Sequence, residues 1–418
     1  MPFIRHVKVY MEVYGCAANQ GDASIMQGIL LQQGHEIVDS LEKADAAVIV
    51  TCTVVATTEQ RMLSRIKELD GKVEKIVVAG CMAAAQPELI EKVCRKAVLL
   101  PPRHIHHIVD ALNGGGVYEE RAKVRVPRKV ELRLNIPIAD GCMYNCSYCI
   151  TKKARGNLVS YPLKDIVEDV KEAIKKGCKE IRLTCQDTAS YGRDIGSNLA
   201  ELINEIASIE GDFMIRVGMM HPLSAHRILD ELLEAYGSEK VYKFLHLPLQ
   251  SASPKILRAM RRGYSYEMFK EIVDEFRRKY PESTFATDII VAFPGESQED
   301  FEMSVDAIRE VKPDVTNITR FSPRPHTDAW KMKRMDTKVA KYRSSLLTCI
   351  ANEIAYERNK RCIGKTYRIL LLEKYKGYTI GKTESYKSIF VEGGKLGDFV
   401  IAKAIEATPT HLKANIIA

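Results

Sequence analysis

The 418-residue sequence predicts an α/β protein with three parts: a parallel-sheet domain, a partial TIM-like barrel of six β/α units, and a small OB-like β-barrel. Short apolar runs alternate with amphipathic helical stretches, and this alternation starts afresh near residue 131. After about residue 360, short β-rich runs separated by Gly and charged turns replace it. We therefore expect domains at 1–112, 131–360 and 361–418, with a linker at 113–130.

The first domain is predicted from three strand-like runs with helical stretches between them. The runs read VKVYMEVYGC, DAAVIVTC and KIVVAGC, and residues 58–69 form an amphipathic stretch after the second. Strands that alternate with helices favour a parallel sheet with crossover helices. The segment that follows is Gly-rich and then charged (NGGGVYEERAKVRVPRK), which is typical of a linker.

The central domain repeats the same unit six times. Its helical patterns occupy 163–176, 199–209 and 266–279. Its candidate strands are 132–138, 180–185, 213–218, 244–250, 286–293 and 316–321. Six units of this length predict a barrel that is related to the eight-unit barrel but open on one side.

The last domain carries an excess of positive charge. Residues 361–418 hold ten Lys or Arg and five Asp or Glu, whereas the whole chain has a net charge of +8. Five β-rich runs predict a small OB-type barrel, and a basic β-barrel beside an enzyme core favours nucleic-acid binding. A solvated β-domain without a nucleic-acid partner is the alternative.

Composition limits the class of protein. An apolar content of 46% and a charged content of 28% are typical of a globular chain. No apolar run reaches the roughly 20 residues of a membrane span, and the first residues lack a signal-peptide cleavage site. We therefore expect a cytoplasmic protein without a membrane partner. Eleven Cys in a reducing compartment indicate metal or redox chemistry rather than disulfides.

Three cysteines lie directly after the first predicted barrel strand. Cys142, Cys146 and Cys149 have the spacing C-x3-C-x2-C, which lets three thiolates bind one cubane iron–sulfur cluster. Fully ligated cubanes take four Cys, so three leave one iron open to a small molecule. The position at the C-terminal mouth of a barrel also favours chemistry. A zinc knuckle completed by a distant fourth residue is the alternative.

A second set of three cysteines is dispersed in the sequence. Cys16, Cys52 and Cys81 each follow a predicted strand of the first domain. Because the carboxyl ends of parallel strands meet at one edge of a sheet, these thiols can converge there. They would then form a second cluster with one open iron. Three small buried residues with a packing role are the alternative.

The other cysteines and a group of histidines give weaker signals. Cys185 ends the second barrel strand at the mouth, where packing is the expected role. We expect buried or incidental roles for Cys94, Cys178, Cys349 and Cys362, and surface roles for His104, His106 and His107.

The first cysteine motif, with Tyr148 before its last Cys, resembles that of the radical S-adenosylmethionine enzymes. The stretches YGCAANQGD, VTCTVVATTEQ and AGCMAAAQPE resemble the three cysteine segments of the methylthiotransferase domain. ARGNLVSYP, LTCQDTASYGRDIG, RVGMMHP and HLPLQSAS resemble its archaeal and eukaryotic branch, and the C-terminal part resembles the RNA-binding TRAM domain. Tyr161 fits this branch, whereas Cys185 and Gln186 depart from the expected cofactor-pocket residues.

The resemblance implies a radical S-adenosylmethionine tRNA methylthiotransferase that converts N6-threonylcarbamoyladenosine, at position 37 beside the anticodon, to its 2-methylthio derivative. It implies two [4Fe-4S] clusters, bound by Cys142, Cys146 and Cys149 and by Cys16, Cys52 and Cys81. The first would bind S-adenosylmethionine and generate the 5′-deoxyadenosyl radical, and the second would hold the inserted sulfur. Both open irons would face one cavity between the first domain and the barrel mouth. No catalytic residue is expected beyond the cluster ligands.

Further residues are candidates for cofactor or substrate contacts. We expect Tyr148 (through its backbone), Gln186, Asp187 and Gln250 to contact the cofactor. Arg155 is a candidate phosphate or tRNA contact, or else a surface residue. Asp288 is expected to be a satisfied carboxylate and Gly295 to lie in a turn. Residues 331–335 are expected to form a solvated basic face, with a tRNA backbone contact as the alternative.

The expected partners are the tRNA anticodon stem-loop and a reducing protein, and the chain is expected to be a monomer. Two alternatives within the family act on isopentenyladenosine in tRNA or on a ribosomal-protein aspartate. An alternative of another class is a non-catalytic iron–sulfur protein that binds RNA. Two incomplete cysteine triads argue against it, because structural metal sites are normally closed.

Overall fold

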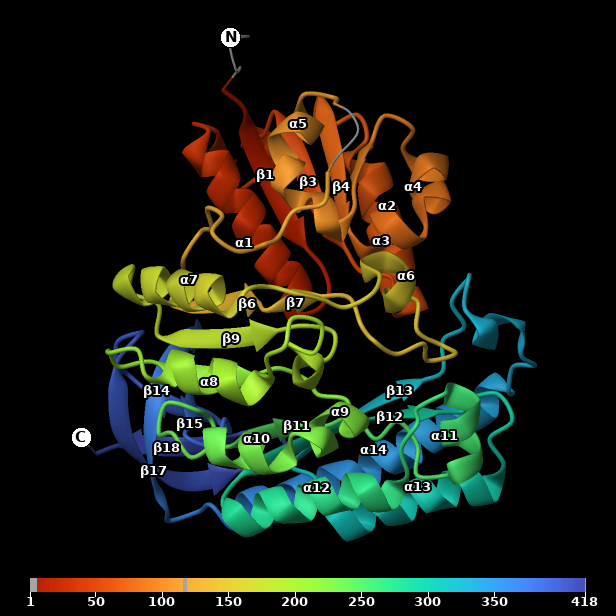
Figure 1. The fold of residues 1–418 in the computed structure, drawn as a ribbon, viewed down its shortest axis with the longest axis vertical. Coiled ribbons are helices and arrows are strands. Elements are labelled where there is room, and N and C mark those ends of the chain that lie inside the picture. The colour runs from red at the N-terminus through yellow and green to blue at the C-terminus, as the bar shows by residue number, and fades with distance from the viewer. Residues whose placement is uncertain (1–5, 116–118, 418) are drawn as a thin grey trace.

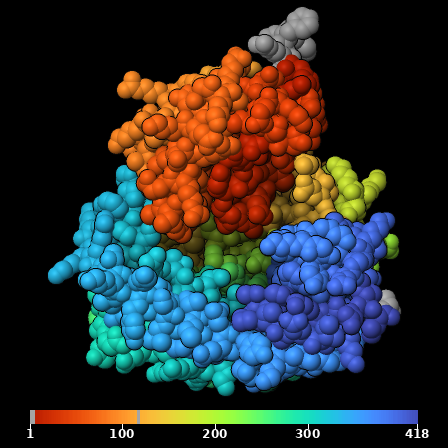
Figure 2. All heavy atoms as spheres, turned by 180° about the vertical axis from the view of Figure 1, so that it is seen from behind, coloured from red at the N-terminus to blue at the C-terminus, as the bar shows by residue number. Residues whose placement is uncertain are grey.

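The computed structural model describes residues 6–115 and 119–417. An N-terminal α/β domain sits on a partial barrel, and a small β-barrel lies against one end of that barrel (Figure 1). Seen from behind, the green middle of the chain is recessed beneath the N-terminal domain and beside the C-terminal barrel (Figure 2). The predicted fold class is confirmed.

The N-terminal domain is a five-stranded parallel sheet in the order β2-β1-β3-β4-β5. Its strands are β1 (Lys8–Val13), β2 (Glu36–Val38), β3 (Ala46–Thr51), β4 (Lys75–Gly80) and β5 (Val98–Leu100). Its helices are α1 (Ala17–Gln32), α2 (Ala56–Leu69), α3 (Cys81–Ala85), α4 (Pro87–Val93) and α5 (Ile108–Leu112). All of β3 is buried because helices cover both faces of a parallel sheet, which explains its unbroken apolar run.

Six parallel strands form the central barrel as two sheets, β6-β9-β10 and β11-β12-β13. A bridge between Ile215 and Val241 joins the sheets, and no ladder among the described residues joins β6 to β13, so the barrel is open there as predicted. The strands are β6 (Arg133–Pro137), β9 (Glu180–Thr184), β10 (Met214–Val217), β11 (Phe244–His246), β12 (Thr284–Val291) and β13 (Val315–Arg320).

Helices cover the outside of this barrel. They are α7 (Leu163–Lys175), α8 (Leu199–Ala207), α9 (Pro222–Arg227), α10 (Leu229–Ala235), α11 (Pro254–Met260), α12 (Tyr266–Lys279), α13 (Gln298–Val311) and α14 (Thr337–Lys360), whereas α6 (Thr151–Arg155) packs on α3 of the N-terminal domain. A short ladder of β7 (Ala139–Asp140) and β8 (Val159–Ser160) follows β6. The strand predicted at 244–250 is shorter than expected: Pro248 lacks an N–H, and Gln250 has a φ of 67° that takes it out of the extended conformation.

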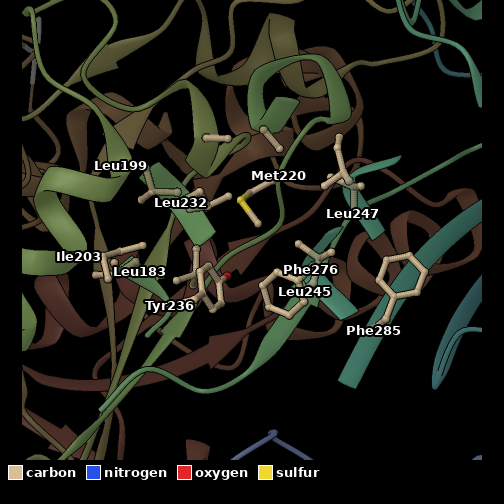
Figure 3. Packing of buried hydrophobic residues seen from close by; sticks show 14 of the residues in the cluster. Leu183, Leu199, Ile203, Met220, Leu232, Tyr236, Leu245, Leu247, Phe276 and Phe285 are labelled. Atoms are coloured by element: carbon tan, nitrogen blue, oxygen red, sulfur yellow. The ribbon is translucent and has the colours of Figure 1, made fainter. Parts of the chain in front are cut away.

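The core of the barrel is a single apolar cluster between strands and helices. Side chains from β9 and β11 meet side chains from α8, α10 and α12 in the barrel wall (Figure 3). The residues labelled there are Leu183, Leu199, Ile203, Met220, Leu232, Tyr236, Leu245, Leu247, Phe276 and Phe285. This packing fixes the strand ends, which carry the loops described below.

The C-terminal domain is a closed five-stranded barrel in the order β14-β15-β16-β18-β17. Its strands are β14 (Thr366–Tyr375), β15 (Tyr378–Thr383), β16 (Ser388–Glu392), β17 (Phe399–Ala407) and β18 (Leu412–Ile416). Lys387 and Arg368 pair with Asp314 and Asp212, each at 2.6 Å, just before β13 and β10 begin. The domain therefore covers the N-terminal ends of the central strands, opposite the loop that carries Cys142.

No helix in the described ranges combines the length and the apolarity that a membrane crossing requires.

Candidate functional site

The loop from Cys142 to Cys149 lies at the C-terminal ends of the barrel strands. Gly141 opens it with a φ of +81°, and a Cβ there would stand 1.9 Å from the Asn157 carbonyl oxygen, so only glycine fits. Within the loop, the backbone N–H of Cys149 donates to the Cys146 carbonyl at 3.1 Å. The predicted cysteine loop at the barrel mouth thus begins at a position that only glycine can occupy and contains a backbone hydrogen bond between two of its cysteines.

Protein groups also contact the thiols of this loop. Arg262 Nη1 donates to Cys146 Sγ at 3.2 Å, and the Tyr144 backbone N–H donates to Cys142 Sγ at 3.4 Å. Burial raises the pKa of Cys142 to about 12 and also raises that of Cys149. Because metals bind thiolates, these thiols would release protons when a cluster assembles.

The second set of cysteines meets at one edge of the N-terminal sheet. Cys16 caps α1 after β1, Cys52 follows β3, and Cys81 begins α3 after β4; these three strands are neighbours. Burial raises the pKa of Cys81 to about 11, Arg155 opposes this shift, and the nearby thiols of Cys16 and Cys52 add to it. The three cysteines thus lie at the same edge of the sheet, near enough for their thiols to act on one another electrostatically.

The donor set of each triad fits an iron–sulfur cluster better than a single ion. Within residues 6–115 and 119–417, no three His, Cys, Asp or Glu side chains converge as one metal ion requires. A cubane places each thiolate on a different iron and so accepts thiols that lie further apart. Thiols without imidazole or carboxylate partners also suit iron–sulfur chemistry.

Helices that adjoin the two triads pack together at the domain interface. Helix α3, which begins at Cys81, packs on α6, which follows Cys149 (Figure 1). Cys81, Ala85, Ile150 and Ala154 form a buried cluster there, and the small alanines let the two helices approach closely. A cavity of about 90 Å³ is lined by Val54, two residues after Cys52, and by Cys149. Cys149 and the segment that follows Cys52 thus border a common space.

Two of the predicted cofactor contacts have polar atoms directed at the site. Gln186 Oε1 accepts a hydrogen bond of 2.7 Å from the Gly141 N–H and so supports the start of the cysteine loop. Gln250 Oε1 is buried and has no hydrogen-bond partner among the described residues. A buried acceptor without a partner is what a polar ligand would satisfy.

The side chains of the other two predicted cofactor contacts, Asp187 and Tyr148, contact other residues of the protein. Asp187 accepts from the His221 backbone N–H at 2.8 Å, from Ser224 Oγ at 2.7 Å and from the Ser190 hydroxyl. The Tyr148 ring packs edge-on against Phe293, with centroids 6.2 Å apart. A cofactor contact of Tyr148 would therefore use its backbone, as expected from the sequence.

The expectation for Arg155 is wrong, because its side chain is 1% exposed and lies between the two domains. Its Nη2 pairs with Asp22 of α1 and its Nη1 with Asp140 of β7, each at 2.7 Å. Lys123 of the linker completes the group, at 2.7 Å from Asp22 and 2.6 Å from Asp140. We call Asp22, Lys123, Asp140 and Arg155 the buried quartet.

Sequence reasoning also missed two arginines near the thiols. Arg262 contacts Cys146 as described above, and Arg324, after β13, is 3% exposed and acts electrostatically on Cys52. No local signal identifies either residue, because their neighbours come from distant parts of the chain.

The other residues singled out in the sequence have contacts that fit packing or structural roles. Cys185 Sγ donates to the Gly141 carbonyl at 3.8 Å, which fits a packing role at the mouth. Asp288 accepts from Asn317 at 2.7 Å and lies 3.2 Å from His246 Nε2, as expected of a satisfied carboxylate. His106 contacts the Glu119 carbonyl of the linker at 3.1 Å. Cys94, Cys178 and Cys362 are buried, and Cys349 is exposed.

Three family models match successive parts of the chain. The model described as uncharacterized protein family UPF0004 matches residues 8–100, the radical SAM superfamily model matches 136–308, and the TRAM domain model matches 360–417. A radical S-adenosylmethionine methyltransferase from Kitasatospora setae, solved with cobalamin and a [4Fe-4S] cluster, has a similar fold. Its TM-score is 0.58 at 14% identity, over 90% of this chain and 77% of that one.

Curated relatives match over nearly the whole length. Two are named probable threonylcarbamoyladenosine tRNA methylthiotransferase. The one from Methanocaldococcus jannaschii is 43% identical over 99% of this chain and 98% of its own. The one from Pyrococcus horikoshii is 45% identical over 98% and 100%. The human threonylcarbamoyladenosine tRNA methylthiotransferase is 35% identical over 88% of this chain and 66% of its own.

The partial barrel, with its cysteine loop at the mouth, and the matching superfamily model define the chain as a radical S-adenosylmethionine enzyme. An iron–sulfur cluster and S-adenosylmethionine follow from that class. Within it, the chain belongs to the threonylcarbamoyladenosine tRNA methylthiotransferase family.

Proposed function

We propose that this protein inserts a methylthio group at C2 of N6-threonylcarbamoyladenosine at position 37 of tRNA. The observation that carries the proposal is the presence of two three-cysteine sets beside one contact, because Cys81 begins α3, Cys149 lies just before α6, and these two helices pack together. One radical S-adenosylmethionine cluster needs only one such set. A second set beside the first is what a sulfur-inserting enzyme requires.

We assign one [4Fe-4S] cluster to Cys142, Cys146 and Cys149 and a second to Cys16, Cys52 and Cys81. When bound, the two clusters with S-adenosylmethionine supply a carbon radical and the sulfur to be inserted, which is chemistry that protein side chains lack. Three thiols in each set leave one iron position for an outside ligand.

The chain's own residues shape this site. Gln186 fixes the Gly141 backbone at the start of the first loop, and Arg262 places a positive charge beside Cys146. The apolar contact between α3 and α6 limits access of water to the interface. Gln250 Oε1 and the Tyr148 backbone are available for contacts with S-adenosylmethionine.

The proposed activity also indicates the partners of the enzyme. The TRAM barrel supports tRNA binding, and the anticodon stem-loop carries position 37. We also propose a reducing partner protein for the clusters and a monomeric enzyme. We also propose a reducing cytoplasmic compartment, because eleven cysteines in one chain suit metal chemistry there.

The names of the relatives favour threonylcarbamoyladenosine over isopentenyladenosine or a ribosomal-protein aspartate as the substrate. The paired incomplete triads argue against a non-catalytic RNA-binding protein.

Iron analysis after anaerobic reconstitution tests the two-cluster assignment. We expect about eight irons in the wild type and about four in each triple variant, Cys142→Ala/Cys146→Ala/Cys149→Ala or Cys16→Ala/Cys52→Ala/Cys81→Ala, because a [4Fe-4S] cluster holds four irons. The variant of the first set should lose reductive cleavage of S-adenosylmethionine, whereas the variant of the second set should retain it. Four irons in the wild type would contradict the assignment.

A further inference from the structure

The N-terminal cysteine triad is bordered by side chains of the other domain. Arg155 belongs to α6 of the central domain, yet its Nη2 donates to Asn19 Oδ1 at 3.0 Å, and Cys81 Sγ lies 3.8 Å from that same oxygen. One side of the triad thus faces a buried cation.

A second buried arginine lies on the Cys52 side of the triad. Arg324 follows β13 and pairs with Glu59 of α2, and its Nη2 donates to Gln86 Oε1 at 3.0 Å. Gln86 in turn donates to Glu59 at 2.7 Å, so the arginine is held by the N-terminal domain. The hydroxyl of Thr53, the residue after Cys52, donates to the same Gln86 oxygen, so Arg324 lies beside the Cys52 loop.

Both arginines keep one donor free. The Nε–H groups of Arg155 and Arg324 are buried and have no hydrogen-bond partner within the described ranges. Each guanidinium is otherwise fixed by ion pairs, so neither can turn to find water. A buried donor without a partner is unfavourable and calls for an acceptor. Sulfur bound to iron beside these cysteines is a suitable one.

We propose that Arg155 and Arg324 are positioning residues for the N-terminal cluster. Both belong to the radical S-adenosylmethionine domain, and the packing of that domain on the N-terminal domain places them on two sides of the cluster. Their guanidinium groups donate to the sulfurs of the cluster and stabilise its reduced, more negative state. This inference rests on the proposed function, because it requires a cluster at Cys16, Cys52 and Cys81.

The proposal predicts that two substitutions at one ion pair shift the reduction potential of the N-terminal cluster in opposite directions. Hydrogen bonds and charge near the sulfurs set the reduction potential of such clusters. Arg324→Gln removes a positive charge, disfavours the reduced state and lowers the midpoint potential. Glu59→Gln removes the counter-ion of the same arginine and raises the potential. A merely structural role for the pair would not produce opposite shifts.

The test uses the full-length chain with Cys142, Cys146 and Cys149 replaced by Ala, so that only the N-terminal cluster gives a signal. The reconstituted protein is titrated with a reductant and followed by electron paramagnetic resonance, together with iron analysis. The variants are Arg324→Gln, Glu59→Gln, Arg155→Lys and Arg155→Gln.

Arg128→Gln is the matched control. Arg128 is also a buried arginine, but it pairs with Asp169 at 2.5 Å, and its charged neighbours are Asp169 and Glu172. Loss of its ion pair should lower thermal stability without changing the midpoint potential.

We expect a lower potential for Arg324→Gln and for Arg155→Gln, partial recovery in Arg155→Lys, and a higher potential for Glu59→Gln. Equal potentials in all variants that hold four irons would overturn the inference while leaving the second cluster in place. If the Arg324→Gln variant binds no iron, the Glu59→Gln variant tests the inference instead: a higher midpoint potential supports it, and an unchanged or lower one overturns it. A parent protein that binds no iron would instead refute the two-cluster function.

Discussion

At the scale of single residues, the first cysteine loop depends on neighbours that hold its backbone. Gln186 lies two residues after β9 and reaches across to the N–H of Gly141, one residue before Cys142. Position at a strand end predicted that Gln186 lies near the site. The sequence could not predict whether its amide contacts the cofactor or the loop, because that depends on the path of the loop.

Replacing Gln186 tests this supporting role. Gln186→Ala leaves the Gly141 N–H without its acceptor, which typically costs about 1–3 kcal/mol. We expect the rate of S-adenosylmethionine cleavage to fall roughly tenfold, which corresponds to about 1.4 kcal/mol. Gln186→Glu keeps an acceptor oxygen and should retain most of the activity. Equal activity in Gln186→Ala and wild type would show that the loop does not need this bond.

At the scale of elements, the two cysteine sets meet because α3 and α6 pack together and the buried quartet joins the domains beside them. The convergence of Cys16, Cys52 and Cys81 was predictable, since neighbouring parallel strands end at one edge. The quartet was not predictable, because Asp22, Lys123 and Arg155 lie on three separate segments and have no common spacing. Each charge tolerates burial only because two opposite charges face it.

Removal of one cation tests the quartet. Lys123→Met leaves Asp22 and Asp140 with only Arg155 as a positive neighbour, and breaking a buried pair typically costs about 3–5 kcal/mol. We expect that loss in the free energy of unfolding measured with denaturant. The double variant Lys123→Met/Asp22→Asn removes one charge of each sign and should recover part of the loss. A change below about 1 kcal/mol in the single variant would contradict this account.

At the scale of the whole molecule, the C-terminal barrel lies at the end of the central barrel opposite the cysteine loop. The sequence predicted a basic five-stranded barrel, but not that several of its cations pair with the central domain. Lys387 and Arg368 bind Asp314 and Asp212, so their charge is not free for RNA. The exposed tip of the β14–β15 hairpin, with Tyr375 beneath Lys376 Nζ at 5.3 Å, remains available.

The hairpin tip gives a prediction for tRNA binding. Lys376→Ala should weaken binding and reduce the slope of log K against log salt by roughly 0.7–0.9, the value for one lost phosphate contact. Tyr375→Ala should weaken binding by about 1–3 kcal/mol if a base stacks on the ring. Lys171→Ala is the control, because this exposed lysine of α7 pairs with Glu168 at 2.7 Å. An equal effect of the control would exclude a specific role of the tip.

The most direct test of the central claim is mass analysis of tRNA nucleosides after incubation with the reconstituted enzyme, S-adenosylmethionine, a sulfur source and a reductant. The substrate is tRNA that carries N6-threonylcarbamoyladenosine at position 37. The account predicts its 2-methylthio derivative with the wild type and none with either triple cysteine variant. A methylthio group on any other base, or product formation without Cys16, Cys52 and Cys81, would contradict it.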